Sequence, residues 1–443
     1  MSRLYPAHLK SLLNNYSKAF NDLQQSLPGL QGLLIHSGSE QIYYGDDRAV
    51  PFQAYGHFCH WLPVNRPDQM LLIRSGAKPQ YFQVIPPDFW YEQSIDNQSW
   101  WADHWDIVHL RQGSEIAAHL GSSAGIGFIG ASSDFASSLG LQPALINPEP
   151  LLHYLDFLRA YKTPYEVEQL RAANAQALRG HQAAQESFHQ GGSEYDIHMA
   201  FLLACQQLEE ESPYTNIVAL DEKSATLHYQ YKRRNSGDRS GKKSQVLLMD
   251  AGCRVNGYCS DVTRTSVRPH TLTKFQSLVQ AMDALQQNLV QLVKPGLDYQ
   301  ALHNAALAGV GQILLDHDIV NESHEYIMKQ RMPSLWFPHG VGHLLGIQVH
   351  DVGGKQQNKQ GAKRDAPADS PALRNTRSMD QDMVFTVEPG MYFIPSLLEP
   401  ERSSVRGKAI NWALVDELTP LGGIRIEDNV LVTASGVENL TRR

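Results

Sequence analysis

The sequence has few cysteines and no long hydrophobic run, and these absences narrow the class of protein. Four cysteines scattered among 443 residues are too few for the disulfide framework of a small secreted domain. No stretch approaches the roughly 18 consecutive apolar residues of a transmembrane helix. The beginning, MSRLYPAHLKSLLNNYSKAF, lacks the apolar core of a secretory signal peptide. We therefore expect a cytoplasmic protein with no membrane partner.

A surplus of basic residues is also missing. The net charge of −8 at pH 7 argues against nucleic acid as the main partner, because phosphate binding needs clustered Lys and Arg. A GxGxxG match at residues 125–130 lies within an apolar run, whereas a dinucleotide site places its glycines after the strand. Neither nucleic acid nor dinucleotide binding is predicted.

The length and the apolar pattern predict two domains, because 443 residues exceed one ordinary core. Residues 1–160 alternate short apolar runs with helical stretches, which indicates a small α/β domain. Residues Thr163 to Glu166 (TPYE) form a capping box that begins a helix. The larger α+β domain is therefore predicted to span residues 161–443, with a mobile polar loop at 355–371 and a solvated turn at 231–243.

Two carboxylates are predicted to meet on one hairpin. The apolar run VLLM leads directly into Asp250, and Asp261 follows after Asn256-Gly257, a strong hairpin signal. A two-residue turn there sets Gly252 opposite Asp261 and makes Asp250 the diagonal neighbour on the same face. Like charges that close repel each other unless a proton or a metal lies between them. An exposed hairpin carrying two aspartates harmlessly remains the alternative.

The segment PHGVGHLLG contributes His339 and His343 at i, i+4 spacing, and His350 follows. Its glycines and proline disfavour a helix, and there is no Glu at Gly340 as in HExxH. Glycines permit close approach of the backbone to a site. We expect a tight turn that places the histidine side chains at a site.

Two more acids lie in apolar strand contexts. Glu388 follows the run VFTV and precedes Pro-Gly, and Glu427 lies in the alternating segment GGIRIEDNV, on the same face as Arg425 and Asn429. Four carboxylates and one imidazole favour Mn²⁺, Co²⁺ or similar ions over a single structural zinc. Such a set suits two ions about 3.5–4 Å apart, bridged by acids and a water.

These segments resemble the pita-bread metallopeptidases, which include Xaa-Pro dipeptidases (prolidases), Xaa-Pro aminopeptidases and methionine aminopeptidases. The resemblance rests on MDAG, SDVTRT, HGVGH, VEPGMYF and GGIRIEDN over residues 160–443. Within the family it is strongest to bacterial Xaa-Pro dipeptidases, whose relatives include organophosphorus acid anhydrolases. That likeness adds YTNIVALDEKSATLHY and GDDRAVPFQAYGHFCHWLPV, so it covers nearly the whole chain.

The resemblance implies a role for each site residue. The metal ligands it implies are Asp250, Asp261, His343, Glu388 and Glu427. The pocket residues it implies are Tyr214, His228, His339, His350 and Arg374, with Asp47 reaching in from a second subunit of a homodimer. It also implies an N-terminal domain that serves in dimerisation and covers the pocket.

The implied reaction is hydrolysis of dipeptides with C-terminal proline by two divalent ions, with Mn²⁺ expected and Co²⁺ or Zn²⁺ as alternatives. Glu388 would act as general base, His350 and His228 would assist catalysis, and Arg374 would bind the substrate carboxylate. Arg425 would orient the ligands. Three alternatives stay open: an aminopeptidase acting on longer peptides, phosphotriester hydrolysis as a side activity, and a metal-free binding module.

Overall fold

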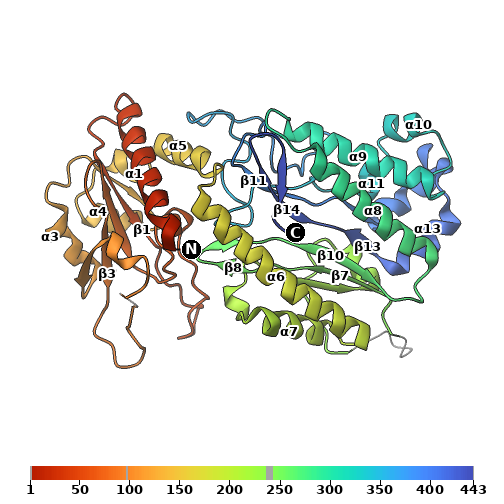
Figure 1. Cartoon of the computed structure of the whole chain (residues 1–443), viewed down its shortest axis with the longest axis horizontal. Helices are drawn as coiled ribbons and strands as arrows, with labels where there is room; N and C mark the ends of the chain where they lie inside the picture. Colours follow the sequence, from red (N-terminus) through yellow and green to blue (C-terminus); the bar gives the residue numbers. More distant parts are fainter. Residues whose placement is uncertain (1, 96–97, 236–242, 443) are drawn as a thin grey trace. The chain divides into compact units, whose positions relative to one another are not determined.

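The computed structural model describes residues 2–95, 98–235 and 243–442, which form two compact units (Figure 1). Unit 1 comprises Met1–Arg159, Thr163–Gln169 and Gln357–Ala362, and unit 2 comprises Ala160–Lys162, Leu170–Gln356 and Lys363–Arg443. Residues 236–242 of the predicted turn at 231–243 lie outside the described residues. In the described part of the chain, no helix combines the length and hydropathy of a membrane span.

Unit 1 is built on a mixed sheet in the order β4-β3-β2-β1-β5. Its strands are β1 Gly32–His36, β2 Met70–Arg74, β3 Gln80–Val84, β4 Asp106–Leu110 and β5 Ile126–Ile129. Strands β1 and β5 are parallel, as are β3 and β4, and the other pairs are antiparallel. The predicted apolar runs are therefore strands, and the GxGxxG match lies around β5 as expected. The helices of this unit are α1 Tyr5–Asp22, α2 Gly56–Cys59, α3 Ala117–Leu120, α4 Ser133–Ser138 and α5 Glu149–Arg159.

Two helices follow along the chain, and both begin at capping boxes. Helix α6 spans Pro164–Gln190, and Thr163 exchanges hydrogen bonds of 2.8 and 3.4 Å with Glu166. Ser193 caps the next helix in the same way through Asp196. The remaining helices are α7 Glu194–Cys205, α8 Thr273–Leu292, α9 Tyr299–Asp316, α10 His324–Lys329, α11 Pro333–Trp336, α12 Pro395–Leu398 and α13 Trp412–Leu418.

The strands of unit 2 form small antiparallel sheets in the orders β10-β7-β6, β11-β14-β15, β12-β13 and β8-β9. Their bounds are β6 Ile217–Leu220, β7 Val246–Asp250, β8 Arg254–Val255, β9 Tyr258–Cys259, β10 Thr263–Val267, β11 Val384–Val387, β12 Gly390–Tyr392, β13 Gly423–Arg425, β14 Asp428–Val432 and β15 Val437–Asn439.

Helices α6 and α7 cover one face of the β10-β7-β6 sheet, whereas the other face packs against strand β12. Leu247 and Met249 of β7 pack against α6 and α7, whereas Leu248 packs against Tyr392 on the other face. Helices α8 and α9 share a second core with β11 and β14 (Figure 1). Carboxylates at the ends of these strands are therefore the side chains that can face a cavity.

The predicted hairpin has the expected register. Val255 pairs with Tyr258 across the Asn256-Gly257 turn, and the same register places Asp250 of β7 opposite Thr263 of β10. Asn256 and Gly257 adopt positive φ angles of 48° and 90°, as this type of turn requires.

Two sequence expectations need correction. The segment 423–430 is not one strand, because β13 ends at Arg425 after pairing with β12, and β14 begins at Asp428 and pairs with β11. The loop at 355–371 is not solvated throughout. Gln356 is only 4% exposed, and Arg364 binds Asp298 at 2.7 and 2.8 Å.

Candidate metal centre and active site

A cavity of about 280 Å³ in unit 2 collects the charged residues that the sequence singled out. Its lining comprises Leu227, His228, Asp250, Asp261, Pro338, His339, Gly340, Gly342, His343, His350, Ala372, Arg374, Glu388, Arg425 and Glu427. All five predicted ligands therefore face one small space, although they come from segments far apart in the chain.

Asp250 and Asp261 converge as the hairpin register predicted. The Tyr214 hydroxyl lies 2.7 Å from Asp250 Oδ1 and 2.6 Å from Asp261 Oδ1, so the two carboxylates share one neighbour. Asp250 is 9% exposed and Asp261 5% exposed. The alternative of an exposed hairpin with two harmless aspartates is thus excluded.

The turn carrying His343 lies beside β11. The His343 amide donates to Thr386 Oγ1 at 3.1 Å, and the His343 carbonyl accepts from the Thr386 amide at 3.0 Å. His343 Nδ1 lies 3.0 Å from the Leu344 carbonyl, which only a protonated Nδ1 can satisfy. In the neutral ring Nε2 is then free to act as a ligand atom. The segment is not helical, as expected.

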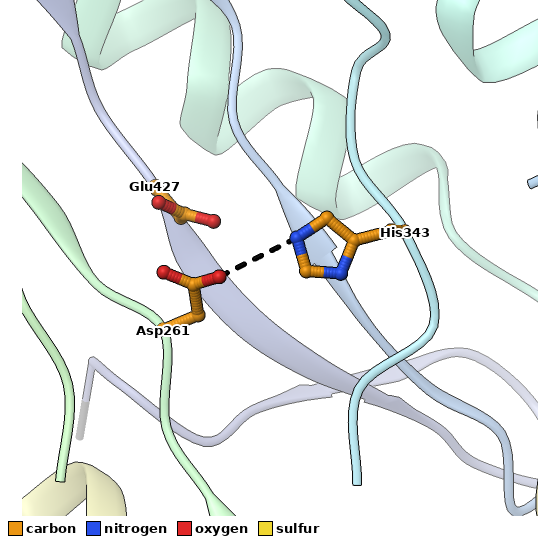
Figure 2. Close-up of side chains that lie close together, drawn as sticks. All are labelled: Asp261, His343 and Glu427. Atoms are coloured by element: carbon orange, nitrogen blue, oxygen red, sulfur yellow. Dashed lines mark ion pairs between the residues drawn. The ribbon is translucent and has the colours of Figure 1, made fainter. Parts of the chain in front are cut away.

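Ligand-type atoms cluster around that Nε2 (Figure 2). Nε2 lies 3.4 Å from Asp261 Oδ2 and 3.6 Å from Glu388 Oε1. Asp261, His343 and Glu427 each contribute one potential ligand atom, and these three atoms lie within 4.8 Å of one another. Glu388 follows directly after β11, and its amide donates to the Val341 carbonyl, so the same strand positions Glu388 and the His343 turn.

Glu427 and Asp250 are held by neighbouring side chains. Thr263 Oγ1 donates to Glu427 Oε2 at 2.6 Å, and Arg425 donates to Asp250 Oδ2 at 2.6 Å and to Thr263 Oγ1 at 3.1 Å. These bonds hold the two carboxylates in fixed orientations. Arg425 therefore contacts Asp250, one of the predicted ligands.

Crowded, buried carboxylates leave an unbalanced negative charge in the site. Burial, reinforced by the neighbouring aspartates, raises the pKa of Glu388 to about 7, and burial raises that of Asp250 to about 6 despite Arg425. The pKa of Glu427 rises well above its ordinary value, again chiefly through burial. Asp261 differs: burial would raise its pKa, but the interaction with His343, whose Nε2 lies 3.4 Å from Oδ2, brings it below the ordinary range.

This arrangement fits divalent cations. Each carboxylate is destabilised by burial and by its neighbours, and a cation among them would relieve both effects. Oxygen donors from four acids plus one imidazole match ions such as Mn²⁺ or Co²⁺.

The structure also places the predicted pocket residues. His228, His339, His350 and Arg374 line the cavity. The His350 ring stands edge-on to His343 with centroids 4.3 Å apart. Burial, followed by the charges of His343 and Arg374, lowers the pKa of His350 to about 4, so its ring is neutral at pH 7.

Asp47 belongs to unit 1 and is exposed in a turn, where its amide donates to Asp46 Oδ1 at 2.8 Å.

Three supporting residues were not predicted. Thr386 Oγ1 lies 3.2 Å from Glu388 Oε1, and the Tyr392 hydroxyl lies 2.8 Å from His339 Nε2 and 2.9 Å from Arg425. Thr263 could have been found from the hairpin register, which sets it opposite Asp250. Thr386 and Tyr392 carry no comparable signal, because their roles depend on contacts between distant segments.

Comparison with known proteins decides the family. Residues 168–434 match the model of metallopeptidase family M24, and residues 3–157 match that of the Xaa-Pro dipeptidase N-terminal domain. The chain belongs to metallopeptidase family M24. It is therefore a metal-dependent hydrolase, and the predicted pita-bread fold is confirmed.

Curated relatives of this M24 chain match along almost its whole length. The Xaa-Pro dipeptidase of Pseudoalteromonas atlantica is 40% identical, covering 100% of this chain and 98% of the relative. That of Pseudoalteromonas translucida is 42% identical, covering 94% and 93% respectively. The structure of Escherichia coli aminopeptidase P with the inhibitor Pro-Leu has a TM-score of 0.74 at 21% identity, covering 100% of this chain and 95% of that one.

Proposed function

We propose that this M24 member hydrolyses dipeptides with C-terminal proline and releases free proline. The observation that carries the proposal is that one small cavity contains a carboxylate–imidazole cluster and, on its wall, the arginine expected to bind a substrate carboxylate. The relatives named Xaa-Pro dipeptidase support the same substrate class.

Asp250, Asp261, His343, Glu388 and Glu427 would hold two divalent ions, and we propose manganese, with cobalt or zinc as substitutes. Bound ions supply Lewis acidity and a nucleophilic water at neutral pH. The intact, converging set of ligands argues against a metal-free binding module.

The protein's own groups complete the reaction. Glu388, whose carboxylate lies beside His343, would accept a proton from the attacking water and deliver it to the proline nitrogen. His350 and His228 would stabilise the developing negative charge on the scissile carbonyl oxygen. His339 and Tyr214 would shape the pocket around the substrate.

Arg374 would distinguish a dipeptide from a longer chain, because only a dipeptide carries a carboxylate directly on the proline. A guanidinium can bind both carboxylate oxygens at once. An amide at the same position, as in a tripeptide, offers a single neutral oxygen.

We further propose that the chain is a cytoplasmic homodimer. Residues 1–160 would form the dimerising domain and cover the pocket of the catalytic domain, residues 161–443. In that assembly Asp47 would reach the pocket of the partner.

The experiment compares Arg374→Ala with the unmodified enzyme on Ala-Pro and on a phosphotriester. Losing one partner of a desolvated charge pair costs roughly 2–5 kcal/mol, so kcat/KM for Ala-Pro should fall by about 30-fold or more. Any phosphotriester turnover should change little, because that substrate has no carboxylate. Arg331→Ala, at an arginine with a 67% exposed side chain, is the control.

Equal losses on both substrates would instead indicate damage to the metal site. Unchanged kinetics on Ala-Pro would remove Arg374 from substrate binding.

A further inference from the structure

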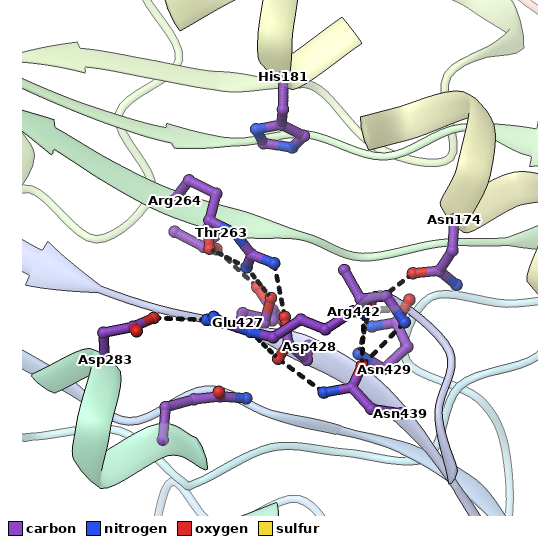
Figure 3. Close-up of polar contacts among 12 residues, drawn as sticks. Asn174, His181, Thr263, Arg264, Asp283, Glu427, Asp428, Asn429, Asn439 and Arg442 are labelled. Atoms are coloured by element: carbon purple, nitrogen blue, oxygen red, sulfur yellow. Dashed lines mark hydrogen bonds and ion pairs between the residues drawn. The ribbon is translucent and has the colours of Figure 1, made fainter. Parts of the chain in front are cut away.

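A second cluster of charged groups lies directly behind Glu427 (Figure 3). Asp428, the next residue, has a side chain that is 0% exposed, yet it receives hydrogen bonds from two guanidinium groups. Arg264 donates to its Oδ1 at 2.6 Å, and Arg442 donates to its Oδ2 at 2.7 Å. Asn439 donates to Oδ2 at 2.9 Å. We call Arg264, Asp428 and Arg442 the rear clamp.

Arg264 also binds the backbone at the metal site. One of its nitrogens donates to the Glu427 carbonyl at 2.6 Å and to the Thr263 carbonyl at 2.9 Å. The Thr263 carbonyl accepts the Glu427 amide, and the Thr263 hydroxyl holds the Glu427 carboxylate. The Arg264 guanidinium therefore holds the backbone of Glu427 and also the backbone of Thr263, whose hydroxyl binds the Glu427 carboxylate.

Asp428 connects this contact to a second ligand. It pairs with Val387 across β14 and β11, and Val387 immediately precedes Glu388. Arg442 extends the connection to α8 through Asp283 at 2.5 Å. The clamp thus fixes the junction between β13, which pairs with β12, and β14, which pairs with β11. Glu427 lies at this junction.

The clamp does not touch the space proposed for substrate. Arg264 and Arg442 border a different cavity of about 550 Å³, lined also by His181, Leu247 and Met249. None of the residues lining that cavity lines the active-site pocket. Replacing a clamp residue should therefore affect substrate turnover only by changing the positions of the proposed metal ligands.

We propose that Arg264, Asp428 and Arg442 are positioning residues that preorganise Glu427 and Glu388 and so set metal affinity. The inference rests on the proposed role of Glu427 as a ligand. Partners that orient a ligand typically change metal affinity by about 10–100-fold. Arg264 should matter most, because it holds the Glu427 backbone as well as Asp428.

The test measures Mn²⁺ dissociation constants by calorimetry, together with the thermal midpoint of the metal-free protein. Arg264→Met should weaken Mn²⁺ binding by about tenfold or more, and Arg264→Lys should recover part of the loss, because Lys keeps the charge but lacks the fork. At saturating Mn²⁺, KM should stay unchanged and kcat should return to within about threefold.

Arg406→Met is the matched control. Arg406 binds Glu401 at 2.6 and 2.7 Å, and its side chain is 29% exposed, close to the 25% of Arg264, but it lines neither cavity. Its loss should lower stability alone, so the Mn²⁺ affinity of Arg406→Met should equal that of the unmodified protein. If Arg264→Met binds Mn²⁺ as tightly as Arg406→Met, the clamp has no positioning role.

Two further variants keep the outcomes distinct. If Arg264→Met does not fold, Arg442→Met tests the same clamp from the Asp428 side, with normal Mn²⁺ affinity overturning the proposal. Glu427→Gln tests the ligand assignment itself. Unchanged Mn²⁺ binding in Glu427→Gln would contradict the proposed function, whereas weakened binding there with normal binding in the clamp variants would contradict only the clamp.

Discussion

His339 and His343 lie in the same short segment but meet different partners. His343 Nε2 faces Asp261 and Glu388, whereas His339 Nε2 lies 2.8 Å from the Tyr392 hydroxyl. Burial, with the charge of Arg425, lowers the pKa of His339 to about 3, which keeps its ring neutral. Residue type and spacing alone do not separate these two histidines, but their surroundings do.

We predict that His343→Ala loses bound metal, whereas His339→Ala retains it and loses turnover more modestly. Removing a ligand deletes a donor atom, and removing a pocket histidine leaves the donor set intact. Elemental analysis of both purified variants checks this. Metal loss in His339→Ala with full occupancy in His343→Ala would reverse the two assignments.

His303 on α9 gives a pH prediction independent of the metal site. It is 2% exposed, its ring lies 5.7 Å from that of Phe337, and its Nδ1 has no hydrogen-bond partner within the described residues. Burial lowers its pKa to about 4 from an ordinary 6.5. Between those values the unfolded chain binds a proton that the folded chain excludes, so the folded state loses stability as pH falls from about 6.5 to 4.

Replacing His303 with leucine removes this dependence, because leucine does not titrate. The stability of the unmodified protein relative to His303→Leu should fall by roughly 1.4 kcal/mol for each pH unit across that window. Calorimetric midpoints of both proteins from pH 7 to pH 4 provide the measurement. Parallel pH profiles would show that His303 does not contribute to acid destabilisation.

At the scale of elements, the turn carrying His343 depends on its close approach to β11. Gly342 has φ of +150°, and a Cβ there would overlap the Thr386 carbonyl oxygen and the Tyr299 hydroxyl. Thr386 in turn holds the His343 amide. A side chain at position 342 must therefore displace either the turn or the strand.

Gly342→Ala should lower kcat/KM for Ala-Pro by about 100-fold, since a shift of about 1 Å at a catalytic group costs that much. Gly296→Ala is the control, because Gly296 also has a positive φ of 84° but has open space around its Cα. It should lose some stability and keep its activity. Similar activity in the two variants would indicate that the His343 turn tolerates displacement.

Local signals predicted most of the elements around the site. The capping box at Thr163 and the Asn256-Gly257 turn act over a few residues, so they can be identified in one sequence. The break between β13 and β14 was missed, because the alternating pattern of 423–430 is the same whether the strand keeps or changes its partner. Its position depends on β11 and β12, which lie elsewhere in the chain.

The same distinction applies to the site. The acids of the predicted site stood out because Asp250 and Glu388 follow apolar strands and the hairpin register brings Asp261 beside Asp250, and the family resemblance implied the full ligand set. Thr386, Tyr392 and the rear clamp were not, because threonine, tyrosine and paired arginines are common in positions without function. The roles proposed for these residues depend on contacts among segments that lie far apart in the chain.

At the scale of the whole molecule, the catalytic cluster and its pocket lie entirely in unit 2, whereas Asp47 lies in unit 1. Unit 1 alone therefore contains none of the proposed ligands. Its proposed contribution is to dimerise and to confine the pocket to short substrates. In the proposed account, the metal site, Arg374 and the assembly of subunits together distinguish a dipeptide from a longer peptide.

The most direct measurement compares Ala-Pro with Ala-Pro-Ala, using protein stripped of metal and protein reconstituted with Mn²⁺. We expect free proline from Ala-Pro only after reconstitution, with kcat/KM about 30-fold or more above that for alanine release from the tripeptide. Equal rates on the two substrates would make the protein an aminopeptidase instead. Undiminished hydrolysis by the stripped protein would contradict the metal mechanism altogether.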